Sequence, residues 1–246
     1  MKIFIILVFL IFLVNLSKEN FYNNSSCILL TTSVYLNHKH NSRRLKNLPY
    51  YRKKLYIETI EKYRNIYNGI IYIVDSSGYK FEEFKNYKNI KILSFDLNNF
   101  KHNYKNKTPM EAISIIYAFR YFKLYKYDVI FKITGKYFIK DINNITSNID
   151  NSDFYIQHFC RKEGSKFKYQ PAEILGFKKE NITFFYYLAG KLNDDKCLES
   201  SAVIEPYLTQ LLNNSTYKFK RLSKIMLEKP IERGCNKCDR KILYYI

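Results

Sequence analysis

Several common catalytic and cofactor-binding motifs are missing from this sequence of 246 residues. No Gly-x-Gly-x-x-Gly follows the first predicted strand, which disfavours the usual dinucleotide-binding fold, and no P-loop is present. The nucleophile elbow Gly-x-Ser-x-Gly and the zinc motif His-Glu-x-x-His are also absent. The sequence therefore does not indicate a common serine hydrolase or zinc hydrolase.

Tryptophan is absent and acidic residues are scarce: 22 Asp and Glu stand against 41 Lys and Arg, which gives a net charge of +19. Such a charge can indicate binding to nucleic acid, anionic lipid or a phosphorylated substrate. The cations are spread along the whole chain, however, and the abundance of Lys, Asn, Ile and Tyr is typical of codons rich in A and T. We therefore predict a generally basic surface and no nucleic-acid partner.

The longest apolar run is too short to span a bilayer, which takes roughly 20 residues. It covers residues 3–14 after Lys2, the pattern of a signal-peptide core or a short signal anchor. Residues 15–18 offer no small-x-small cleavage site, so both alternatives stay open. Either one predicts that residues 1–18 direct the chain to the secretory pathway, as a lumenal domain held at the endoplasmic reticulum or Golgi membrane or as a secreted protein.

Cysteine is uncommon, and the five present allow two disulfides with one thiol left over. The one close pair is Cys235-x-x-Cys238, which lacks a second pair of ligands at matching spacing. A lumenal disulfide is therefore favoured over a zinc site. Asn-x-Ser/Thr sequons, for example at Asn144 and Asn181, are compatible with glycosylation on a secretory route.

Strand and helix patterns alternate along the rest of the chain. Strands are predicted within residues 27–36, 69–79, 89–96, 129–139, 153–159 and 172–177, and helices at 49–67, 108–126, 181–192 and from Pro206 onward. This order predicts an α/β fold: a single domain over residues 27–215, built as a three-layer sandwich with a mostly parallel central sheet. Residues 216–246 are predicted to form a basic C-terminal extension that contains the close cysteines.

Polar residues stand where the predicted strands end. Thr31 and Thr32 end the apolar run of the first strand, and Asp75 ends the second. Because the carboxyl ends of parallel strands meet at one edge, where such sheets bind ligands, we expect these side chains to converge there.

The stretch VIFKITGKYFI at residues 129–139 is a strand pattern interrupted by Lys132, Thr134, Gly135 and Lys136. With the helix pattern before it, this stretch resembles the central segment of GT-A-type glycosyltransferases, where a lysine-containing strand leads into an aspartate-x-aspartate motif. It also resembles a viral and bacterial glycosyltransferase-like group with a lysine-isoleucine-threonine-glycine-arginine-tyrosine stretch. By strand order the resemblance covers roughly residues 27–210.

The resemblance implies a GT-A-like, Rossmann-like domain that transfers a sugar from a nucleotide-sugar donor to a glycan or glycoprotein acceptor. Here Thr134, Gly135 and Lys136 stand where the family has acidic metal ligands. A Thr-Gly-Lys cluster cannot hold a divalent cation but can supply positive charge and hydrogen-bond donors to the leaving diphosphate. We therefore predict transfer without a metal or other cofactor, with Lys136 and Lys132 facing the diphosphate and Gly135 allowing close approach of the backbone.

The same resemblance implies that Thr31, Thr32 and Asp75 contact the nucleotide and that Glu111 lies near the donor sugar. Two of these residues have ordinary structural alternatives. Asp75 also fits a turn, and Glu111 fits a capping box with Thr108 at the start of its predicted helix.

An inverting transferase needs a carboxylate that deprotonates the acceptor hydroxyl. Glu205, just before the predicted helix start, and Glu173 are the candidates, although a carboxylate at a helix start is favoured by the helix dipole in any case. The alternative to an enzyme is a non-catalytic lumenal binding protein on a degenerate glycosyltransferase fold.

Overall fold

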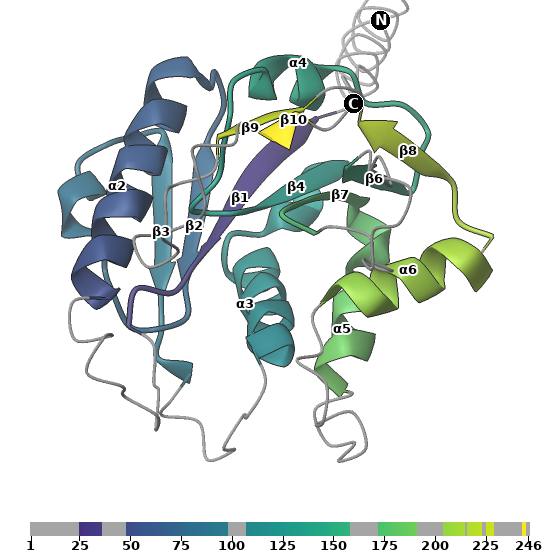
Figure 1. The fold of residues 1–246 in the computed structure, drawn as a ribbon, viewed down its shortest axis with the longest axis horizontal. Coiled ribbons are helices and arrows are strands. Elements are labelled where there is room, and N and C mark those ends of the chain that lie inside the picture. The colour runs from purple at the N-terminus through teal and green to yellow at the C-terminus, as the bar shows by residue number, and fades with distance from the viewer. Residues whose placement is uncertain are drawn as a thin grey trace, which may run out of the picture.

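A seven-stranded sheet forms the centre of the molecule, in the order β3-β2-β1-β4-β7-β6-β8 (Figure 1). The computed structural model describes residues 25–35, 48–97, 107–157, 172–190, 204–214, 216–222, 225–228 and 243–244. The strands of this sheet are β1 (Ser26–Thr32), β2 (Ile71–Asp75), β3 (Ile90–Ser94), β4 (Val129–Thr134), β6 (Phe154–Gln157), β7 (Ile174–Lys178) and β8 (Phe219–Leu222).

The sheet is mostly parallel, as the alternating pattern predicted. β3, β2, β1 and β4 pair in parallel with one another, and β6 pairs in parallel with β8. β7 is the reversed strand, because it is antiparallel to both of its neighbours, β4 and β6. Mixed sheets with one reversed strand are common among large α/β folds.

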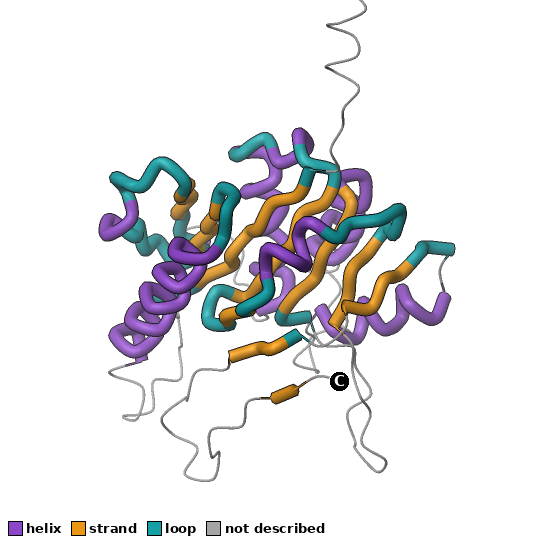
Figure 2. The backbone as a smooth tube through the Cα atoms, turned by 90° about the horizontal axis from the view of Figure 1, so that it is seen from above, coloured by secondary structure: helices purple, strands orange, loops and turns teal. Residues whose placement is uncertain are grey.

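Helices cover both faces of the sheet, which Figure 2 shows from above. α2 (Leu48–Ile66) packs on one face, while α3 (Lys107–Tyr121), α5 (Thr183–Gly190) and α6 (Ile204–Asn214) pack on the other. Alternate residues of β1 accordingly enter two separate cores: Ile28 and Leu30 face α2, and Cys27 and Leu29 face α3. Burial on both faces explains why this strand is a continuous apolar run and not an alternating one.

The segment predicted as one strand at residues 129–139 forms two strands in different sheets. β4 ends at Thr134, the Tyr137 N–H donates to the Thr134 carbonyl across a turn, and β5 (Phe138–Ile139) follows. β5 pairs with β9 (Met226–Glu228), which pairs with β10 (Leu243–Tyr244). The polar residues 134–136 therefore lie at the passage from the main sheet to a small second one.

Two predicted helices also differ at their ends. The helix expected over residues 108–126 ends at Tyr121, because Lys123 adopts a left-handed backbone (φ 53°) before the short 3-10 helix η4 (Leu124–Lys126). α6 begins at Ile204, ahead of Pro206, which its first turn accommodates because a proline there loses no helical hydrogen bond.

Part of the predicted C-terminal extension belongs to the sheets, since β8 and β9 fall within residues 216–246. The predicted targeting segment and four of the cysteines lie outside the described residues. Cys27 is a buried free thiol, and burial raises its pKa, so it stays protonated. Among the described residues, no helix is both long and apolar enough to cross a membrane.

Gly176 on β7 gives space to aromatic side chains from both neighbouring strands. A Cβ atom at this position would lie 2.6 Å from Cε1 of Phe131 and 2.8 Å from Cβ of Tyr155. The two rings pack with their centroids 5.4 Å apart. A glycine is therefore required here by packing, within the core that faces α2.

We expect Gly176→Ala to lower the free energy of unfolding by about 1–3 kcal/mol, because the added methyl group must displace an aromatic ring. Urea unfolding followed by circular dichroism measures this change. Gly190→Ala is the matched control, since a Cβ there would meet nothing within 4 Å. Equal stability of the two variants would contradict the packing argument.

Candidate active site at the carboxyl ends of β1 and β4

The strand order reverses at β1, which is the first strand of the sheet in the chain. From β1 the chain builds β2 and β3 on one side, whereas β4 lies on the other side. Ligands of doubly wound sheets bind outside the carboxyl ends of the strands at such a switch point. The sequence-predicted residues Thr31 and Thr134 are register partners at this position, so the structure brings them together.

Lys132 on β4 is buried directly behind this edge, with 1% of its side chain exposed. Its Nζ atom donates to the Ala172 carbonyl (2.7 Å) and to Oγ1 of Thr134 (3.1 Å), and lies 2.7 Å from Oε1 of Glu111. Three acceptors match the three protons of an ammonium group. We expected Lys132 to face a diphosphate, but these contacts direct its charge into the protein.

Glu111 receives two of the polar contacts at this edge through one oxygen. Besides the Lys132 ammonium, the Thr31 hydroxyl donates to Oε1 at 2.9 Å. The carboxylate lies in the second turn of α3, and 27% of its side chain stays exposed. Glu111 is thus fixed in direction yet accessible. The predicted capping box is not formed, because α3 begins at Lys107 and Thr108 is therefore inside the helix instead of at its N-cap.

Asp75 and Thr32 lie on the opposite face of the sheet, toward α2. Asp75 is fully buried, and its Oδ2 atom accepts hydrogen bonds from the Thr32 hydroxyl (2.9 Å) and the Val34 N–H (3.2 Å). Its Oδ1 atom accepts from the N–H (2.8 Å) and the hydroxyl (2.7 Å) of Ser77 and from the Tyr79 N–H (3.0 Å). This carboxylate therefore ties together the loops after β1 and β2, and its oxygens do not converge with Glu111.

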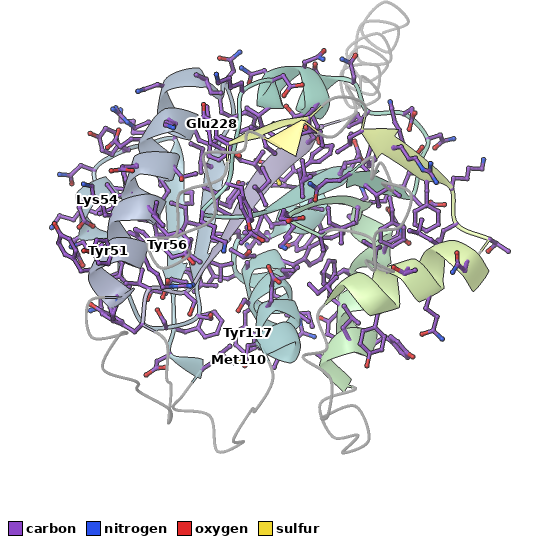
Figure 3. The ribbon with its side chains drawn as sticks, viewed as in Figure 1. Tyr51, Lys54, Tyr56, Met110, Tyr117 and Glu228 are labelled. Atoms are coloured by element: carbon purple, nitrogen blue, oxygen red, sulfur yellow. The ribbon has the colours of Figure 1, made fainter. Side chains whose placement is uncertain are left out.

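Gly135 packs against the end of β1. Its N–H donates to the Thr31 carbonyl at 2.8 Å, and a Cβ atom here would lie 2.6 Å from Cγ2 of Thr32 and 3.3 Å from Cδ1 of Tyr56. Tyr56 is held on α2, where its hydroxyl accepts a bond from Arg52 (2.7 Å) and burial raises its pKa (Figure 3). Packing thus explains the glycine at position 135, whether or not a phosphate binds there.

Three predicted site residues remain: Lys136, Glu173 and Glu205. Lys136 is half-buried, with Nζ 5.3 Å from the ring centroid of Tyr137. Glu173 is half-buried next to the site, because its carbonyl accepts the Thr134 N–H at 2.8 Å. The backbone of Glu205 lies in α6, and its side chain is outside the described residues. Its predicted role therefore stays a prediction.

Two further observations concern metal binding and cavities. Within the described ranges, no group of three or more His, Cys, Asp or Glu side chains is arranged to bind a metal ion. An open cavity of about 530 Å³ lies at the other edge of the sheet, lined by Asp128, Asp150 and Lys179 among others. Because Asp128 precedes β4, this cavity is not part of the candidate site.

Sequence reasoning missed the connection of Lys132 to Glu111 and to the Ala172 carbonyl. The one available signal was strand parity, since Thr31, Lys132 and Thr134 all belong to the face that α3 covers. Nothing in the sequence marks the Ala172 carbonyl as an acceptor.

Comparison with known proteins finds similar solved structures, each with low sequence identity to this chain. No protein-family model and no curated protein matches the chain. Among solved structures, it is similar to a glycosyltransferase involved in the glycosylation of the major capsid of PBCV-1, with 13% identity, a TM-score of 0.45, and coverage of 80% of this chain and 81% of that one.

Two further transferases have comparable similarity. The glycosyltransferase GlyE of Streptococcus pneumoniae TIGR4 has 13% identity and a TM-score of 0.47, over 81% of this chain and 46% of that one. The galactosyltransferase LgtC, in complex with donor and acceptor sugar analogs, has 10% identity and a TM-score of 0.43, over 80% and 73%. None of these similarities assigns a donor, an acceptor or a catalytic residue to this chain.

We expect Glu111→Leu to cost about 3–5 kcal/mol of stability, because it leaves the buried ammonium of Lys132 without its counter-charge. The double variant Glu111→Leu/Lys132→Met should recover most of this loss, and a double-mutant cycle of urea unfolding measures the coupling. Glu82→Gln, in an exposed pair with Lys85, is the control and should change stability by less than about 1 kcal/mol. Additive single effects would contradict the pairing.

Proposed function

We propose that this protein is a glycosyltransferase that moves a sugar from a nucleotide-sugar donor to a glycan or protein acceptor without a bound metal ion. The observation that carries the proposal is the carboxylate of Glu111, which Lys132 and Thr31 hold at the switch point of the sheet. The segment beside it, residues 129–139, is the one whose sequence resembles the central segment of GT-A-type glycosyltransferases.

In this proposal Glu111 orients the donor sugar. A carboxylate with one oxygen bound to an ammonium and a hydroxyl cannot rotate freely, so its exposed part presents acceptor lone pairs in a fixed direction. Sugar hydroxyls are donors that such an acceptor can align. Fixing the donor in this way supplies catalysis through orientation, without any change of charge on Glu111.

Lys136 supplies positive charge to the departing nucleoside diphosphate. It lies in the same turn as Gly135, and the Thr31 carbonyl and Thr32 hold that glycine against β1. A cation fixed near developing negative charge lowers the barrier as a metal ion would, and such groups are worth roughly 10²–10³-fold in rate. Glu173, which is joined through its carbonyl to Thr134, is the carboxylate proposed to deprotonate the acceptor hydroxyl.

A second function is favoured because two residues that were predicted to bind the ligand make their hydrogen bonds within the protein instead. Both oxygens of Asp75 and all three protons of Lys132 are engaged within the protein. A binding protein that has kept the fold without its chemistry would have such a site. It would bind a sugar or nucleotide without turning it over.

The test is hydrolysis and transfer of UDP- and GDP-sugars by the purified full chain, with EDTA and with added manganese. We expect turnover that EDTA does not abolish and that Lys136→Ala lowers by about 10²–10³-fold. Lys91→Ala, which removes an exposed cation from β3, is the matched control and should leave turnover unchanged.

Each other outcome contradicts a defined part of the proposal. Turnover that requires manganese contradicts the metal-independent mechanism. Saturable donor binding without turnover under any condition favours the binding protein. A Lys136→Ala variant as active as Lys91→Ala removes Lys136 from the mechanism.

A further inference from the structure

Exposed tyrosines and cations share a surface formed by the last turns of α3 and the η4 segment that follows. The side chains of Tyr121 and Tyr125 are 65% and 55% exposed. We call this region the tyrosine–cation surface, and its members are Arg120, Tyr121, Lys123, Tyr125 and Lys126. Tyr117, one turn earlier, is not a member, because its ring stacks on that of Phe95 beside the carboxyl end of β3, with centroids 5.2 Å apart.

The charge of this surface is entirely positive. Residues 112–127 contain no Asp or Glu, and no ion pair to Arg120, Lys123 or Lys126 occurs within the part of the chain that the structure describes. Two of the cations lie over aromatic rings instead. Arg120 is 5.3 Å from the ring centroid of Tyr186 on α5, and Lys126 is 5.2 Å from that of Tyr127. The surface therefore carries uncompensated positive charge next to amphipathic rings.

The position of the surface follows from the fold. α3 connects the carboxyl end of β3 to the amino end of β4, so its last turn lies at the amino edge of the sheet. There the Asp128 N–H donates to the Ser25 carbonyl at 2.8 Å, and the Ser25 N–H donates to Oδ2 of Asp128 at 3.0 Å. Ser25 is where the chain enters β1, and the apolar run of residues 3–14 precedes it in the sequence. The candidate active site is at the opposite edge.

We propose that the tyrosine–cation surface rests on a membrane that contains anionic lipid. Lys123, Lys126 and Arg120 would face lipid phosphates, and the tyrosine rings would lie at the level of the headgroups, where amphipathic aromatic side chains are favoured. The nearby carboxylates of Asp128 and Asp150 are paired with Lys179 and Lys220. The positive charge of the surface is therefore left to match an anionic partner. The apolar run that precedes Ser25 gives lipid the preference over nucleic acid or a second copy of the chain.

This arrangement would direct the candidate site away from the lipid. Because the two edges are at opposite ends of the strands, a domain that lies on its amino edge opens Glu111 toward water and soluble donors. The inference holds whether or not that site transfers a sugar, so the two proposals fail independently.

The test uses the full chain and measures how binding depends on lipid charge, because the apolar run alone can bring it to any vesicle. Flotation is compared between vesicles of phosphatidylcholine and vesicles that also contain phosphatidylserine. The cation variant is Lys123→Asn/Lys126→Gln, in which asparagine tolerates the left-handed backbone of residue 123. The aromatic variant is Tyr121→Ser/Tyr125→Ser.

A matched control is available on α2, whose exposed Tyr50, Tyr51 and Lys54 form a similar group at a different place (Figure 3). Figure 3 labels Tyr51 and Lys54 on α2 and Tyr117 on α3. The control variant is Tyr50→Ser/Tyr51→Ser/Lys54→Gln. Thermal melting of all variants checks that the fold is retained.

We expect the full chain to bind phosphatidylserine vesicles more tightly than neutral ones, and the cation variant to lose about 30-fold of that affinity. Hydrogen exchange in residues 120–127 should slow on the anionic vesicles and not on the neutral ones. The aromatic variant should bind both kinds of vesicle more weakly, and the control should behave as the parent chain does.

Equal binding to both kinds of vesicle, or no effect of the cation variant, would overturn the proposal. Salt-sensitive binding of RNA that the cation variant abolishes, without vesicle binding, would assign the surface to nucleic acid. Concentration-dependent dimers that the aromatic variant separates, again without vesicle binding, would assign it to a second copy of the chain.

Discussion

The buried ammonium of Lys132 is the constraint on which the candidate site depends. An ion with 1% of its side chain exposed must be neutralised and hydrogen-bonded, and three acceptors from different parts of the chain do this. They come from the second turn of α3, the end of β4 and the short segment that leads into β7. The cost of leaving this charge unpaired holds Glu111, Thr134 and Ala172 in one arrangement, so the charge that stabilises the edge also aligns its exposed carboxylate.

The carboxylates on the two faces of the sheet have different roles at this edge. On the α2 face, Asp75 uses both carboxylate oxygens to hold the loops after β1 and β2. On the α3 face, Glu111 keeps part of its surface open to solvent. The two carboxylates therefore differ: Asp75 is saturated by backbone N–H and hydroxyl donors, whereas Glu111 is not. Of these two carboxylates, Glu111 on the α3 face is the one with exposed surface that a ligand could contact.

Much of the architecture could be predicted because buried parallel strands are continuous apolar runs, as in Ile28 to Leu30, and helices repeat every three or four residues. The contacts of the site could not. Lys132 and Glu111 are far apart in sequence, and their pairing needs the packing of α3 on the sheet. The two-residue strand β5 was also missed. Its partner β9 lies about ninety residues later, so the local sequence pattern cannot predict the pairing.

The pairing of β5 with β9 has a consequence for how the protein is made. The turn that carries Gly135 and Lys136 is anchored on one side by β1 and β4, and on the other by residues 226–228. Glu228 adds ion pairs to Lys62 on α2 and to Lys140 just after β5. During synthesis the first anchor emerges from the ribosome long before the second. The edge of the sheet can thus form early, but the turn that bears Lys136 gains its full support only after about ninety further residues have been made.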